Sequence, residues 1–296
     1  MAWWQLTVEC SADELDTVEN CLLELGAVSL TIGDACDEPI YEPLPGDTPL
    51  WSRSTITGLF DQAQPLEALY DELVGCLPQH LVPSIKQEQL QDQVWERAFL
   101  ERYQPARFGQ NLWIVPSWHD PPEPAACNII LDPGIAFGTG GHPTTALCLE
   151  FLDAHPPRGN SVIDYGCGSG ILAIAARKLG ARQLACVDLD RQALDATARN
   201  AERNGLDPAD FNISLPDQLS LEPCDYLIAN ILSGPLIELE PRFAALTRTG
   251  GRLLLSGILP EQAQAVQTAY DRHFTLDAVT IRDGWCRITG IRNSAH

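Results

Sequence analysis

Residues 162–174 read V-I-D-Y-G-C-G-S-G-I-L-A-I, and they are the most informative segment of the chain. A short apolar run ends in an acid, glycines follow at 166, 168 and 170, and a second, helix-compatible apolar run comes next. Glycines leave no side chain between the end of a strand and the start of a helix, so a nucleoside-bearing ligand can lie against bare backbone. The stretch therefore predicts a nucleoside cradle without saying which nucleoside it holds.

Strand and helix signals alternate on both sides of this cradle, which predicts an α/β fold with a doubly wound, mostly parallel sheet. Two further strand-like runs near the end of the chain add an antiparallel hairpin, for seven strands in all. Strands are predicted at 127–131, 161–165, 184–188, 225–230, 250–256, 274–282 and 285–290, and helices at 143–154, 170–179, 191–204, 234–247 and 260–271.

The first third of the chain has a different pattern, β-α-β-β-α-β, which is the order of a small ferredoxin-like α+β domain. Ser11 and Glu14 form a capping-box pattern at the start of its first helix. We expect this domain at 1–91, a linker helix at 92–103, and the α/β domain at 104–296.

Charge is concentrated in the first third. The 296-residue chain has a net charge of −21, and residues 1–100 carry −15 of it, with 18 acidic and three basic side chains. Such a surface repels phosphate backbones, so direct nucleic-acid binding is not expected. It would attract a basic protein, although a solubility role explains the charge equally well. Only Lys86 and Lys178 are lysines.

Ten cysteines are scattered without any C-x-x-C pair, so no metal site is expected. Most read as buried thiols of a reducing compartment. The first residues lack the basic start and apolar run of a signal peptide, and no run approaches 18 apolar residues. The sequence predicts a cytoplasmic protein without a membrane span.

The glycine spacing argues against hydride transfer. A dinucleotide-binding G-x-G-x-x-G would place its third glycine where Ile171 stands. With Asp164 the string is instead D-x-G-x-G-x-G, which resembles motif I of class I S-adenosylmethionine-dependent methyltransferases. V-D-L-D at 187–190 ends the next strand. There Asp188 can accept bonds from both ribose hydroxyls, and Asp190 suits a helix cap.

Asn230, in L-I-A-N-I-L-S-G-P-L, occupies the position of the N-P-P-Y box of amine and amide methyltransferases. Its side-chain carbonyl can accept a bond from the target nitrogen and orient the nitrogen's lone pair toward the methyl group. The glycine-rich run 131–145 precedes a helix and can close over a ligand, with Thr145 offering a hydroxyl. His142 in this run could be a general base, but a helix-capping role is favoured.

Several of these segments together resemble the bacterial ribosomal protein L-eleven methyltransferase family, which methylates lysine side chains and α-amines of a large-subunit ribosomal protein. They are the run 132–145, the glycine loop, N-I-L-S-G-P-L, W-C-R-I-T-G at 285–290, W-E-R at 95–97 and the run 107–118. The resemblance implies S-adenosylmethionine contacts at Thr145, Gly166, Gly168, Asp188 and Asn230, with Asn230 also catalytic. It implies a basic ribosomal protein as partner, which the N-terminal domain recognises.

The chain departs from the family pattern in two places: Gly141 replaces a threonine, and Phe99 stands where tryptophan is common. Two other functions stay open. One is a class I methyltransferase acting on a glutamine amide or a small molecule, and the other is a non-catalytic nucleoside-binding scaffold. Incubation with labelled S-adenosylmethionine and ribosomal proteins would separate them.

Overall fold

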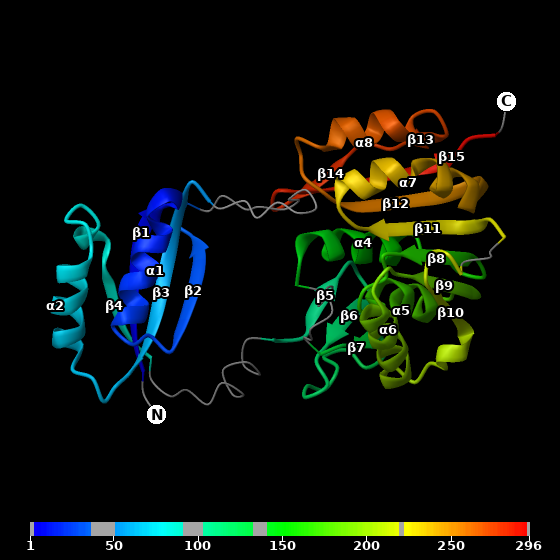
Figure 1. Ribbon diagram of the computed structural model, residues 1–296. Coiled ribbons are helices and arrows are strands. Elements are labelled where there is room, and N and C mark those ends of the chain that lie inside the picture. Colours follow the sequence, from blue (N-terminus) through cyan, green and yellow to red (C-terminus); the bar gives the residue numbers. More distant parts are fainter. Residues whose placement is uncertain (1–2, 37–50, 91–102, 133–140, 219–221, 295–296) are drawn as a thin grey trace. The chain divides into compact units, whose positions relative to one another are not determined.

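The computed structural model describes residues 3–36, 51–90, 103–132, 141–218 and 222–294. The chain forms two compact units, Met1–Glu101 (unit 1) and Arg102–His296 (unit 2), and each is described by itself (Figure 1). Of the predicted linker helix at 92–103, all residues but Tyr103 lie outside the described part of the chain.

Unit 1 is a four-stranded antiparallel sheet in the order β2-β3-β1-β4, with two helices packed on it. Alternating apolar residues of β1 and β3, such as Leu6, Val8 and Phe60, form the core with α1 and α2. In the 3-10 turn Ala12–Glu14, which leads into α1, the Ser11 N–H donates to Glu14 Oε2 at 3.1 Å. The elements are β1 Trp3–Ser11, α1 Leu15–Glu24, β2 Ser29–Asp34, β3 Arg53–Asp61, α2 Leu66–Cys76 and β4 Lys86–Leu90.

The cysteines are mostly buried thiols, with one correction to the expectation. Cys21 of α1 and Cys76 at the end of α2 form a disulfide, with Cα atoms 5.9 Å apart. Residues separated by 55 positions meet here because both helices lie on one face of the sheet. Of the other eight, Cys36 is exposed, Cys127 is partly buried and six are buried.

Unit 2 is built on an eight-stranded sheet in the order β10-β9-β8-β11-β12-β15-β13, with β14 also paired to β15. The first five strands are parallel, and β13, β14 and β15 add antiparallel pairs. The strands are β8 Ser161–Tyr165, β9 Gln183–Val187, β10 Phe211–Ser214, β11 Cys224–Asn230, β12 Thr247–Ile258, β13 Phe274–Leu276, β14 Thr280–Arg282 and β15 Trp285–Arg292.

Helices cover both faces of this sheet, as Figure 1 shows. One face packs against α4, α5 and α6, and the other against α7 and α8. Each face has its own apolar cluster, so the α/β expectation is confirmed. The helices are α4 Pro143–Ala154, α5 Ile171–Lys178, α6 Arg191–Arg203, α7 Ser233–Leu246 and α8 Ala263–Tyr270. No helix in the described ranges is both long and apolar enough to span a membrane.

Three details of the sheet were predicted wrongly. The run 127–131 is not part of the large sheet. Its strand, β7 (Cys127–Ile130), pairs with β6 (Leu112–Val115), which pairs with β5 (Ala106–Phe108) in a separate sheet. The run 274–282 divides into β13 and β14, and β10 was not predicted. The large sheet therefore has eight strands instead of seven.

Candidate functional site

The glycine loop joins the carboxyl end of β8 to α5. Gly166, Gly168 and Gly170 have φ angles of +79°, +54° and +77°, a region that disfavours other residues. A Cβ on Gly166 would overlap the Cγ2 methyl of Ile231, and one on Gly170 would lie 2.8 Å from Thr197 Cγ2. Glycine is therefore required at 166 and 170, because Ile231 and Thr197 occupy the space that a side chain there would need.

Asp188 follows β9 and lies against this loop. Its Oδ2 accepts a hydrogen bond from the Gly168 N–H at 2.9 Å, and its Oδ1 accepts one from the Asp190 N–H at 3.0 Å. An ionised carboxylate can accept about four bonds, so both oxygens keep capacity for ligand hydroxyls. Asp190 is the N-cap of α6, where it accepts from the Gln192 N–H at 2.8 Å, and this prediction is confirmed.

Asn230 and Thr145 meet beside the loop although 85 positions separate them. Asn230 ends β11, and its Nδ2 donates to Thr145 Oγ1 at 3.3 Å. Thr145 is in the first turn of α4 and is fully buried. The next residue after Asn230, Ile231, is the one that packs against Gly166. The structure thus brings all five predicted site residues to one edge of the sheet.

Two parts of the run 131–145 can be described, because residues 133–140 lie outside the described ranges. Before them, Asp132 accepts from the Ser117 N–H at 2.7 Å and forms an ion pair with Arg203 at 2.9 Å. After them, a Cβ on Gly141 would meet no atom of the described residues within 4 Å.

His142 is the N-cap of α4, as the capping interpretation predicted, and its Nδ1 accepts from the Thr144 N–H at 3.4 Å. Its ring also contacts Trp285 edge-on, with centroids 4.8 Å apart. Burial lowers the pKa of His142 below its ordinary value, because it disfavours the charged ring.

Asp164, the acid of the glycine motif, is 1% exposed, and its Oδ2 accepts from the Ala173 N–H at 3.0 Å. Its Oδ1 is buried and has no hydrogen-bond partner among the residues that the structure describes. Burial raises the pKa of Asp164 to about 7. A buried acceptor that lacks a partner is costly, so this oxygen is compatible with a polar group bound beside the loop.

These features fit a nucleoside cofactor that also carries polar groups. The glycine loop provides the cradle, and the Asp188 carboxylate oxygens can accept further hydrogen bonds. The Asn230–Thr145 pair adds an amide and a hydroxyl. Three or more metal-binding side chains do not gather anywhere in the described ranges.

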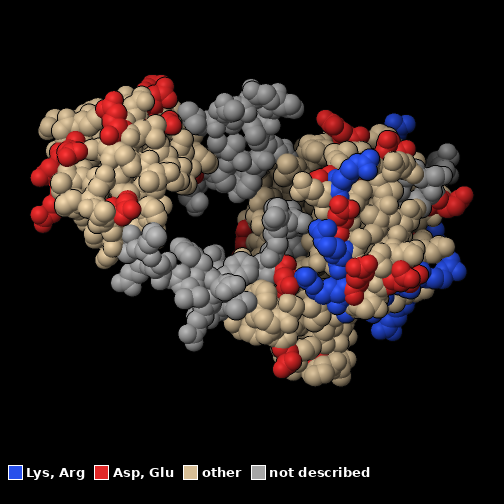
Figure 2. Space-filling model, turned by 60° about the horizontal axis from the view of Figure 1, so that its bottom comes forward, with Lys and Arg blue, Asp and Glu red and all other residues tan. Residues whose placement is uncertain are grey.

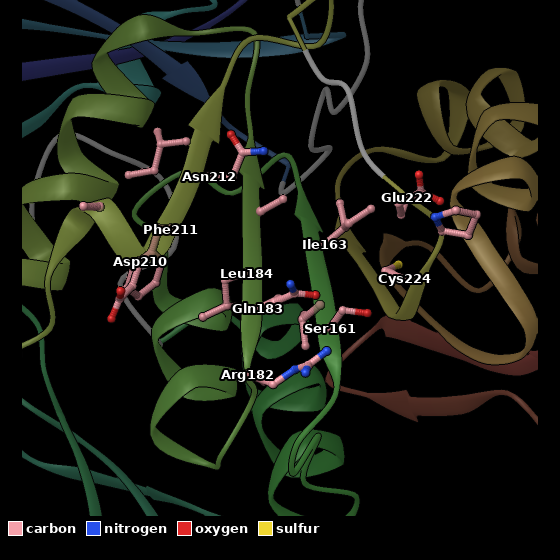
Figure 3. Close-up of a pocket in the computed structure, with 15 residues that line it drawn as sticks. Ser161, Ile163, Arg182, Gln183, Leu184, Asp210, Phe211, Asn212, Glu222 and Cys224 are labelled. Carbon is pink, nitrogen blue, oxygen red and sulfur yellow. The ribbon is translucent and has the colours of Figure 1, made fainter.

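A separate cavity of about 740 Å³ lies at the opposite edge of the sheet, at the amino ends of β8, β9, β10 and β11 (Figure 3). Its lining mixes Arg182 with Asp210 and Glu222, and includes Ser161 and Asn212. None of the five predicted site residues lines it, so it is distinct from the loop edge.

Comparisons with known proteins agree with this geometry. Residues 2–293 match the family model described as ribosomal protein L11 methyltransferase (PrmA). A relative of that name from Azotobacter vinelandii is 53% identical over 296 residues, covering 99% of this chain and all of the relative. One from Pseudomonas aeruginosa is 51% identical over 298 residues, with the same coverage.

A solved structure, the ribosomal protein L11 methylase from Lactobacillus delbrueckii subsp. bulgaricus, superposes with a TM-score of 0.58 at 30% identity. The match covers 65% of this chain and all of that one. Family membership gives the chain methyltransferase activity and S-adenosylmethionine as its cofactor. The chain belongs to the ribosomal protein L11 methyltransferase family of class I S-adenosylmethionine-dependent enzymes.

Proposed function

We propose that this enzyme transfers methyl groups to lysine side chains and the N-terminal α-amine of ribosomal protein L11. The observation that carries the proposal is the Asn230–Thr145 contact at the glycine-loop edge. Because Asn230 Nδ2 donates to Thr145, the side-chain carbonyl is the part of the amide left to accept from an incoming amine. The relatives at 51–53% identity bear the name of this substrate.

The five residues have distinct roles in this proposal. Gly166 and Gly168 give the cofactor bare backbone, Asp188 binds its ribose hydroxyls, and Thr145 fixes the amide of Asn230. Asn230 is the catalytic residue, since it touches the nucleophile. Bound S-adenosylmethionine supplies an electrophilic methyl group on a sulfonium, so the protein mainly aligns the reactants and excludes water.

The nucleophile must be a neutral amine, and a lysine has an ordinary pKa of about 10.4. Asn230 holds the amine by one N–H, and this leaves the nitrogen lone pair directed toward the methyl carbon. When bound, S-adenosylmethionine would supply the methyl group, and Asn230 would hold the neutral amine in line for the transfer. His142 is engaged as a helix cap and is not assigned as a base, so the proton leaves to water before attack.

Unit 1 is the substrate-recognition part of this proposal, corresponding to the domain at 1–91 and followed by a linker and the catalytic domain at 104–296. In the view of Figure 2, acidic side chains are spread over unit 1, and the basic side chains in sight lie on unit 2. An acidic surface accelerates encounter with a basic ribosomal protein and repels nucleic acid. A cytoplasmic location, where ribosomal proteins are made, follows from the same proposal.

The test is methylation of purified L11 with labelled S-adenosylmethionine by the full chain. Wild type should label L11 on lysines and its α-amine, as mass spectrometry would show. Asn230→Ala should lower kcat by about tenfold or more, with little change in melting temperature.

Asn212→Ala is the matched control, because Asn212 is exposed and lies at the other edge of the sheet. Its turnover should equal that of the wild type. Turnover of Asn230→Ala within about twofold of wild type would remove the orienting role. Labelling of a small molecule or a glutamine amide in place of L11 would overturn the proposed substrate.

A further inference from the structure

Helix α6 carries a polar stripe on the face that meets the glycine loop. Thr197, Asn200 and Asn204 follow each other at spacings of three and four, so they lie on one side of the helix. Thr197 is completely buried, although a threonine in a helix interior is usually better placed at the surface. The stripe therefore has partners that compensate for its burial.

Two of the three residues hold backbone carbonyls of the glycine loop. Thr197 Oγ1 donates to the Gly168 carbonyl oxygen at 3.1 Å, and Asn200 Nδ2 donates to the Ser169 carbonyl oxygen at 2.8 Å. A Cβ on Gly170 would lie only 2.8 Å from Thr197 Cγ2, so Thr197 limits how closely the loop approaches the helix. Consecutive peptide units of the loop are thus fixed by side chains of one helix.

The helix itself is anchored at both ends. Asp190 caps its start two residues after Asp188. At its end, Asn204 pairs with Ile130 of β7: its Oδ1 accepts from the Ile130 N–H at 2.8 Å, and its Nδ2 donates to the Ile130 carbonyl at 2.8 Å. Because α6 is held at both ends, Thr197 and Asn200 present their donors to the loop from a fixed position.

We propose that Thr197 and Asn200 are positioning residues that preorganise the glycine loop for the cofactor. In a trans peptide unit the C=O and N–H bonds point in opposite directions. Holding the Gly168 and Ser169 carbonyls toward α6 turns these oxygens away from the site and fixes the peptide planes before binding. A loop that is already in its bound conformation binds more tightly because less freedom is lost. The inference rests on the proposed roles of Gly166 and Gly168.

Matched variants separate positioning from packing. Thr197→Val keeps the shape but removes the hydroxyl donor, and Thr197→Ser keeps the donor. Asn200→Asp keeps the shape but replaces the amide donor with an acceptor. Asp195→Asn, an acid-to-amide exchange on the exposed face of the same helix, is the control. Calorimetric titration with S-adenosylmethionine gives the Kd, and hydrogen exchange of peptides covering 166–172 gives the loop opening.

Thr197→Val and Asn200→Asp should each raise the Kd about fivefold to tenfold and speed exchange of the loop amides. Their kcat at saturating cofactor should stay within about twofold of wild type. Thr197→Ser and Asp195→Asn should match wild type in both measurements.

Two results would overturn the inference: an unchanged Kd in both donor-less variants, or equal weakening in Thr197→Val and Thr197→Ser. If Thr197→Val fails to fold, the Kd and the loop exchange of Asn200→Asp decide between the outcomes, because Asn200 is only half-buried. Wild-type protein that fails to bind the cofactor would instead refute the loop assignment on which the inference rests.

Discussion

Substitution of Asp188 tests the cofactor site most directly. Its carboxylate already accepts two backbone N–H groups, from Gly168 and Asp190, and has capacity for two ribose hydroxyls. Hydrogen bonds to a charged group contribute about 1.5–3 kcal/mol, so Asp188→Ala should weaken cofactor binding by roughly that amount. The Kd for S-adenosylmethionine should then rise about 10-fold to 150-fold.

Isothermal titration of the wild type and Asp188→Ala with S-adenosylmethionine measures this change. A cofactor analogue without ribose hydroxyls separates the ribose contacts from the support that Asp188 gives to Gly168. Removing the hydroxyls should weaken binding to the wild type and have little further effect in Asp188→Ala, since the partner is already gone.

Asp190→Ala is the matched control from the same V-D-L-D segment. It removes only a helix cap, so it should lower the free energy of unfolding by about 1 kcal/mol and leave the Kd within about twofold. The ribose assignment is refuted if Asp188→Ala binds as tightly as the wild type. It is also refuted if removing the ribose hydroxyls from the cofactor weakens binding equally in the wild type and in Asp188→Ala.

Three further predictions concern the loop, the buried acid and the charge of unit 1. Gly166→Ala should lower the free energy of unfolding by at least about 1–2 kcal/mol, because its φ is left-handed and its Cβ would overlap Ile231. The loss should be smaller in an Ile231→Ala background, and equal losses would contradict the overlap. Burial raises the pKa of Asp164 to about 7, so the native state retains this proton longer than the unfolded state and loses stability as pH rises from about 4 to 7. In denaturation across that range, Asp164→Asn should gain on the order of 2–4 kcal/mol relative to wild type, whereas a constant difference would argue against burial as the cause. Finally, kcat/KM toward L11 should fall several-fold between about 50 and 500 mM salt while kcat changes little, and an unchanged kcat/KM would rule out electrostatic steering.

Much of the fold could be predicted because its signals are local. His142 and Asp190 cap their helices with side chains that bond two residues ahead, so position alone indicates them. The carboxyl ends of parallel strands meet at one edge, which is why Asp188 and Asn230 could be assigned to one site from separate segments.

What could not be predicted depends on partners far away in the chain. The apolar run at 127–130 indicates a strand but not that β6 is its neighbour. The four residues of β10 are too few for a periodic signal. The donors of Thr197 and Asn200 act on carbonyls about 30 positions away, and the Cys21–Cys76 pair needs two helices to dock on one sheet. Such contacts follow from tertiary packing, and the spacing of residues in the local sequence does not indicate them.

The distribution of cysteines makes the natural chain ready for site-selective labelling. Cys36 is the one exposed free thiol, six others are buried, and burial raises the pKa of the partly covered Cys127. A maleimide fluorophore should therefore react first at Cys36, since reactivity follows exposure and thiolate content. The dye would report on unit 1, so fluorescence anisotropy could follow the arrival of the ribosomal protein without engineering a single residue.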